Sequence, residues 1–185
     1  GRGAATLPFD WIRTRLEGVL HFLRSDFAGF FEFATQQPVP GSAGGMIMYR
    51  GYLHSFWHDD PTEPAMREKY KRRMERLRSI NATHEPVLFV RSVASTDELP
   101  HSPELLADLQ ARFGRHAHLL LICDFQDCPD GAALVQDFPN LLLYFFNRSV
   151  HDTSRLGPYD DPVMCGLDWA VGRQVEALVL PSLVA

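Results

Sequence analysis

Apolar residues in the first part of the chain recur with the period of amphipathic helices. The pattern predicts a helix over about residues 14–27, which Thr14 opens as the first residue of a capping box. Prolines and glycines mark a surface loop over 36–45, and a strand is expected over 46–52. A proline near the start of the next periodic segment predicts a helix over 62–80.

The second half of the chain alternates short apolar runs with helical patterns. Runs begin at Val87, Leu119 and Leu141, and a helix capped by Ser-Pro is predicted over 102–113. Runs that are apolar on both faces predict a parallel sheet that is covered on both sides by crossover helices. A last helix is predicted over 161–178. We therefore expect the whole chain to form one three-layer α/β domain with a mostly parallel sheet.

Composition narrows the class of protein without indicating its chemistry. The 185 residues include 18 Lys and Arg against 23 Asp and Glu, a formal net charge of −5, which argues against a protein that coats nucleic acid. No apolar run approaches the ~20 residues that cross a bilayer. Three cysteines are too few for a disulfide framework. We expect a soluble intracellular protein with reduced thiols and no membrane insertion.

One predicted helix departs from this acidic balance. The helix over 62–80 carries seven of the 18 basic residues, and we single out Arg67, Lys71, Arg72 and Arg76 as an interaction surface. Such a surface could attract phosphate, nucleic acid or an acidic protein. Because the whole chain is acidic, a solvated helix face is the competing interpretation, and protein partners are expected ahead of nucleic acid.

Polar residues that directly follow the apolar runs are candidates for ligand binding. They are Arg91, Ser92, Asp124 and Asn147. Ligands of parallel sheets bind beyond the carboxyl ends of the strands. An arginine, a carboxylate and an amide at one edge could hold an anionic or sugar-like ligand, and the alternative is that these residues cap strand ends and contact water.

Histidines and acids are densest over residues 52–60. His58 is followed by Asp59, and a histidine with a neighbouring acid can act as a general base. His54 and His58 would share one face if this stretch were helical, but no third ligand is marked, so we expect no metal and no cofactor. Structural or surface histidines are the competing interpretation.

Several segments, taken in order, are similar to one known family. The pattern of that family is a Pro-Phe-Asp-Trp-Ile motif, a helix, a Phe-x-x-Phe pair, an aromatic-His-Asp motif, an Arg-Arg helix and an apolar strand that ends in arginine. The matching segments here are Leu7 to Ile12, Phe27 to Phe31, Ser55 to Asp59, Arg72 to Leu77 and Val87 to Arg91. They resemble a family of papain-like cysteine peptidases. The resemblance implies His58 as the base and Asp10, Asp59 or another acid as its orienting partner.

The chain departs from the family pattern at its start. Family members carry a strand and a Gly-x-x-Cys segment before the Asp-Trp motif, and that cysteine is the proposed nucleophile. The present sequence begins seven residues before Pro8, and no cysteine lies at that position. Since a base without a thiol has nothing to activate, we expect a non-catalytic member that serves as a structural or interaction subunit of a larger assembly. The alternatives are an active cysteine hydrolase, or a sugar- or phosphate-handling transferase, whose first segment lies outside this chain.

Overall fold

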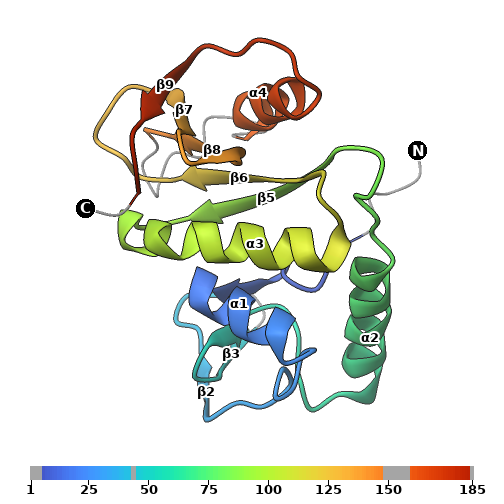
Figure 1. Cartoon of the computed structure of the whole chain (residues 1–185). Helices are drawn as coiled ribbons and strands as arrows, with labels where there is room; N and C mark the ends of the chain where they lie inside the picture. Colours follow the sequence, from blue (N-terminus) through green and yellow to red (C-terminus); the bar gives the residue numbers. More distant parts are fainter. Residues whose placement is uncertain (1–5, 43–44, 148–158, 184–185) are drawn as a thin grey trace. The chain divides into compact units, whose positions relative to one another are not determined.

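The structure is a computed structural model that describes residues 6–42, 45–147 and 159–183 (Figure 1). The chain divides into two compact units, residues 1–80 and residues 81–185. We refer to them as unit 1 and unit 2 and describe each by itself.

Unit 1 combines two helices with an antiparallel sheet of short strands. In the sheet the strands follow the order β1-β4-β3-β2. Pro64 occupies the first turn of α2, as predicted for the helix over 62–80, and the strand predicted over 46–52 is β3. The elements in chain order are β1 (Ile12–Thr14), α1 (Leu16–Arg24), β2 (Thr35–Pro38), β3 (Ile47–Arg50), β4 (His54–Phe56) and α2 (Pro64–Arg78).

The prediction that Thr14 is the N-cap residue of α1 is wrong. Thr14 is the last residue of β1, and Arg15 precedes the first helical residue without a side-chain cap. The Thr14 hydroxyl instead donates to the carbonyl oxygen of Leu53, at 2.7 Å. The hydroxyl therefore bonds to the residue just before β4, a contact that the local sequence pattern did not predict. Helix α1 is also shorter than the predicted span of 14–27.

The core of unit 1 is built from aromatic rings. Phe30 is fully buried and its ring meets those of Phe22, Phe56 and Tyr70 at centroid distances of 5.1, 5.6 and 5.5 Å. The turn that leads into this cluster holds Phe27 with a φ of +65°, a conformation that costs a bulky residue free energy. Burial of the rings offsets that cost, because each aromatic side chain removes a large apolar area from water.

Unit 2 contains a five-stranded mixed sheet in the order β5-β6-β8-β7-β9. Strands β5, β6 and β8 are parallel, β7 is antiparallel to β8, and β9 is parallel to β7. The α/β class and the mostly parallel sheet are thus confirmed for this unit. Its elements are β5 (Val87–Val93), a 3-10 helix η1 (Thr96–His101), α3 (Ser102–Phe113), β6 (Ala117–Cys123), β7 (Gly131–Val135), β8 (Phe138–Phe145), α4 (Asp160–Ala170) and β9 (Ala177–Leu180).

The continuous apolar runs of unit 2 are strands that helices cover. Side chains alternate between the two faces of a strand. Leu120 packs toward α4, where a Cβ on Gly166 would lie 2.8 Å from its side chain, while Phe89 stacks on Phe113 of α3. Gly114 ends α3 with a φ of +125°, and a Cβ there would lie 2.6 Å from the carbonyl carbon of Ala82, so only glycine fits.

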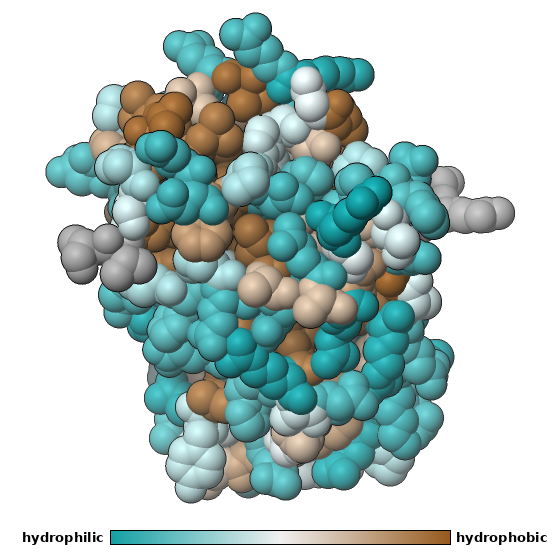
Figure 2. Space-filling model, in the orientation of Figure 1, coloured by the Kyte–Doolittle hydropathy of each residue, from teal (hydrophilic) through white to brown (hydrophobic). Residues whose placement is uncertain are grey.

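The last helix is shorter than the predicted span of 161–178. It ends at Ala170, Gly172 follows with a φ of +79°, and residues 177–180 form β9 instead. Pairing with β7 outweighs helical periodicity here, because the Ala-Leu-Val-Leu segment is rich in strand-forming residues. Figure 2 shows hydrophobic surface over α4 and β9; the exposed apolar residues in and next to these elements are Met164, Leu167, Val171, Leu178 and Val179.

No helix among the described residues is both long and apolar enough to cross a membrane.

Candidate functional site

Strand pairing in unit 1 brings the Asp-Trp motif to the His-Asp motif. Strands β1 and β4 are antiparallel, with Ile12 opposite Phe56. The residues just outside that pair then meet: the ring of His58 lies edge-on to Trp11, with centroids 5.7 Å apart and an interplanar angle of 88°. Two motifs that are more than forty residues apart in the sequence therefore form one surface.

The carboxylates of these motifs bond to groups other than His58. Asp59 accepts a hydrogen bond from the Tyr70 hydroxyl at 3.0 Å and forms an ion pair with Lys69. Asp10 accepts the backbone N–H of Leu7 at 2.7 Å and so closes a turn. Among the described residues, neither carboxylate bonds to the ring of His58, which is exposed.

Aromatic and basic side chains surround His58. Trp11 is 48% exposed, and the guanidinium of Arg13 lies 3.9 Å from the centroid of the Trp57 ring. We call Trp11, Arg13, Trp57 and His58 the motif surface. Beside it is an open cavity of about 410 Å³, lined by Met46, Ile47, Tyr49, Trp57, His58, Asp59 and Asp60.

Asp60 forms the polar corner of this cavity. It accepts hydrogen bonds from the hydroxyls of Thr62, at 2.6 Å, and Tyr49, at 2.7 Å. The Thr62 hydroxyl is the main cause that lowers the pKa of Asp60, and the bond to Asp60 in turn raises the pKa of Tyr49. Asp60 is thus held as an anion that organises the loop after β4.

His54 lies in a different environment from His58. The stretch is a strand and not a helix, so the two histidines do not share a face as a helix would require. His54 is 6% exposed, its Nε2 donates to the carbonyl oxygen of Phe30 at 2.7 Å, and burial lowers its pKa. Its Nδ1 has no hydrogen-bond partner among the described residues.

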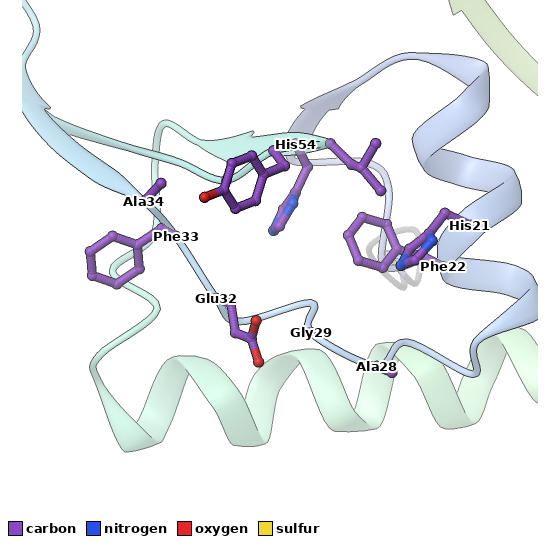
Figure 3. Close-up of a pocket in the computed structure, with 11 residues that line it drawn as sticks. His21, Phe22, Ala28, Gly29, Glu32, Phe33, Ala34 and His54 are labelled. Carbon is purple, nitrogen blue, oxygen red and sulfur yellow. The ribbon is translucent and has the colours of Figure 1, made fainter.

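His54 lines a second cavity, of about 350 Å³, which the sequence pattern did not predict (Figure 3). The sequence gives only a weak signal for this cavity, because a histidine among aromatic residues is usually a core residue. The lining residues are His21, Phe22, Ala28, Gly29, Glu32, Phe33, Ala34, Gly51, Tyr52, Leu53 and His54.

In unit 2 the carboxyl ends of β5 and β6 bring two of the predicted residues together. Asp124 is 4% exposed, and its Oδ2 accepts the hydroxyls of Ser92 and Tyr159, each at 2.5 Å. Oδ1 of Asp124 is buried and has no hydrogen-bond partner among the described residues. Tyr159 was not predicted, because it lies 35 residues from Asp124 in the sequence and precedes a helix rather than following a strand.

The other two strand-end candidates do not join this cluster. Strand alternation places Arg91 on the face of β5 opposite to Ser92. The backbone N–H of Asn147 donates to Asp130 at 2.7 Å, and its side chain is exposed. Of the four predicted residues, Ser92 and Asp124 therefore lie together, and Tyr159 joins them.

The basic residues of α2 divide between structural and exposed positions. Arg67 donates to the carbonyl oxygen of Pro61 at 2.8 Å, and Arg76 donates to that of Thr6 at 2.6 and 3.0 Å. Lys71 pairs with Glu68, and Arg72 is exposed. Arg67 is also exposed, so among these four residues it is the half-buried Arg76 that ties α2 to a distant segment of unit 1.

Comparison with known families gives a match that covers both motifs. Residues 1–125 match the family described as "Putative papain-like cysteine peptidase (DUF1796)". The chain belongs to this family. Comparison with the curated proteins and with the solved structures gave no match.

Two of the three cysteines of this papain-like family member have a raised thiol pKa. All three are free thiols. Burial raises the pKa of Cys123 to about 12, with Asp124 as the next cause, and burial also raises the pKa of Cys165. An attacking thiol needs a lowered pKa, so these two thiols have the opposite character.

Proposed function

We propose that this chain is a non-catalytic member of the papain-like family and binds a protein partner through the motif surface. The observation that supports the proposal is the engagement of both motif acids. Asp59 is held by Tyr70 and Lys69, and Asp10 is held by its own turn. A general base needs an orienting acid and a group to activate, and the geometry of His58 favours neither.

The same surface has the character of a binding hot spot. Residues that dominate protein interfaces are enriched in Trp, Tyr and Arg. Trp11 is half exposed, and Arg13 stacks on Trp57, which pre-orders both side chains before binding. A partner with acidic and aliphatic side chains fits this combination of one cation and two indoles.

A photo-crosslinking experiment tests the proposal. Ile47, which is 42% exposed and lines the neighbouring cavity, is replaced by the photo-reactive p-benzoylphenylalanine, and Gln37 on the exposed strand β2 serves as the control position. The partner captured from native extracts at position 47 and not at 37 is then purified. We expect Trp11→Ala to weaken its binding at least about tenfold and Gln37→Ala to leave the affinity unchanged. Equal capture at both positions, or equal affinities of both variants, would overturn the proposal.

An active hydrolase is the second candidate. The observation that favours it is the contact of Trp11 with His58, because an aromatic edge against an imidazole restricts its orientation. The purified chain is incubated with fluorogenic peptides and with iodoacetamide. Turnover that His58→Ala abolishes and Gln37→Ala retains would establish the hydrolase and overturn the non-catalytic proposal. We expect no such turnover, and no alkylation of Cys123 until the protein unfolds.

A further inference from the structure

The last strand of unit 2, β9, has one side of its backbone unpaired. It lies at the edge of the sheet, beside β7 (Figure 1). The carbonyl oxygen of Leu180 accepts the N–H of Gln136, the residue after β7, at 2.9 Å, so the backbone of Leu180 faces β7. Backbone groups alternate in direction along a strand. The N–H and C=O groups of Ala177 and Val179 therefore point away from the sheet, and no described residue bonds to them.

The side chains of β9 are apolar and exposed on both faces of the sheet. Leu178 and Val179 are 70% and 65% exposed, the two largest fractions among the large aliphatic residues that the structure describes. As neighbours in a strand they project from opposite faces. Helices α3 and α4 pack mainly on β5, β6 and β8, which leaves this edge of the sheet uncovered. Adjacent exposed apolar side chains of this kind mark an interaction surface.

No charge or proline protects the open edge of β9. Proteins commonly place such residues in exposed edge strands, because they block pairing with another chain. The edge strand β2 of unit 1 is polar and ends in Pro38. Strand β9 has the sequence Ala-Leu-Val-Leu, and Pro181 comes only after its last residue. At the opposite edge of the same sheet, β5 has one large apolar residue with an exposed side chain, Val90, at 43%.

The open edge of β9 is complementary to a second copy of itself. In an antiparallel pair centred on Leu178, Ala177 of each copy lies opposite Val179 of the other. These are the residues whose backbone groups point outward, and each such pair exchanges two hydrogen bonds. Leu178 then lies opposite its own counterpart, at a position where side chains approach closely. Glu176 lies opposite Leu180 of the other copy, so no like charges face each other.

We propose that the chain forms a symmetric dimer in which β9 pairs antiparallel with β9 of a second copy. The same patch serves both copies, and the two sheets of unit 2 continue into each other. Residues 177–180 lie outside both the motif surface and the range 1–125 that matches the family, so the dimer does not depend on the proposed function. Because only four residues of each copy pair, the dimer is weak and forms at high protein concentration.

Cysteine substitutions in the full chain test the register of this pairing. In Leu178→Cys the two Cα atoms lie about 4.5 Å apart across the axis, a separation that a disulfide can bridge. Val179→Cys is the matched control: the position is almost as exposed, but its counterpart is a diagonal neighbour about 7–8 Å away. After mild oxidation we expect at least about tenfold more disulfide-linked dimer in Leu178→Cys, above the background of the three native thiols. Equal linkage in the two variants, or more in Val179→Cys, would overturn the proposed register.

Sedimentation equilibrium at increasing protein concentration tests the dimer itself. Leu178→Lys places two like charges opposite each other and should raise the dissociation constant at least about tenfold. Met164→Lys introduces the same charge at an exposed position of α4 and should leave the constant unchanged. Both positions are exposed, so we expect both variants to fold. A wild-type chain that stays monomeric at every concentration, or a dimer that both substitutions weaken equally, would refute the proposal.

Discussion

Two histidines four residues apart differ in almost every physical respect. His54 is buried, donates to the Phe30 carbonyl and contacts the rings of Phe22, Phe30 and Phe56. His58 is exposed and its ring meets Trp11. Strand β4 ends between them, so the chain leaves the core after Phe56. The family motif therefore presents its histidine at the surface, and a histidine outside the motif holds the core.

The largest expected effect is on folding stability. His54→Ala removes a ring from the aromatic cluster together with its hydrogen bond, and we expect a loss of about 3 kcal/mol in the free energy of unfolding. His58→Ala removes an exposed ring and should cost no more than about 0.5 kcal/mol. Urea unfolding of both variants measures the difference, and equal losses would contradict the assignment of His54 to the core.

The acids of the two motifs, Asp59 and Asp10, should also differ in how much they contribute to folding stability. Tyr70 is fully buried, and burial followed by the charge of Asp59 raises its pKa. Asp59→Asn weakens the acceptor of this buried hydroxyl and the ion pair to Lys69, so we expect a loss of about 2 kcal/mol. Asp10→Asn affects an exposed turn and should cost less than about 0.5 kcal/mol in the same assay. A larger loss of stability in Asp10→Asn than in Asp59→Asn would contradict the structural role assigned to Asp59.

A smaller effect should appear in the pH dependence of stability. Burial lowers the pKa of His54 below its ordinary value of 6.5. The unfolded chain therefore binds a proton near pH 6.5 that the folded chain does not, so stability is full above pH 6.5 and falls as the pH drops towards the folded pKa. The slope that His54 contributes is at most about 1.4 kcal/mol per pH unit. Urea unfolding at several pH values measures this profile, which His54→Gln should flatten.

The smallest predicted effect concerns the strand that positions both histidines. Thr14 pairs with His54 across β1 and β4, and its hydroxyl donates to Leu53. Thr14→Val keeps the shape but removes the donor, so we expect a loss of about 1 kcal/mol, and Thr14→Ser should retain most of the stability. Urea unfolding measures both variants, and equal losses in Thr14→Val and Thr14→Ser would contradict this role of the hydroxyl.

The fold of unit 2 was largely predictable because its signals are local. The runs at Val87, Leu119 and Leu141 became strands β5, β6 and β8, and the helix predicted over 102–113 is α3. The short strands β1 and β4 were not predicted, because three residues are too few to show an alternating pattern of apolar and polar side chains. The end of α4 was misplaced because the apolar residues of β9 continue a helical spacing by coincidence.

The candidate sites depended on contacts between distant segments. Ser92 and Asp124 were predicted to meet, since the ends of adjacent parallel strands lie at one edge. Tyr159 was not, because nothing near it marks a strand end. The roles proposed for His58, Asp59 and Asp10 stay predictions, although the structure shows that both acids have other partners.

By itself the sequence determined the family, the strand-helix-strand core of unit 2 and the proline-capped helix α2. These features follow from periodicity, capping residues and motif order, which act over a few neighbouring residues. Only the tertiary structure decided which histidine is buried, which arginines are structural, and that Glu32 and His54 face one cavity. The reason is that burial and pairing depend on the register of strands far apart in the chain, and a register carries no signal within any single segment.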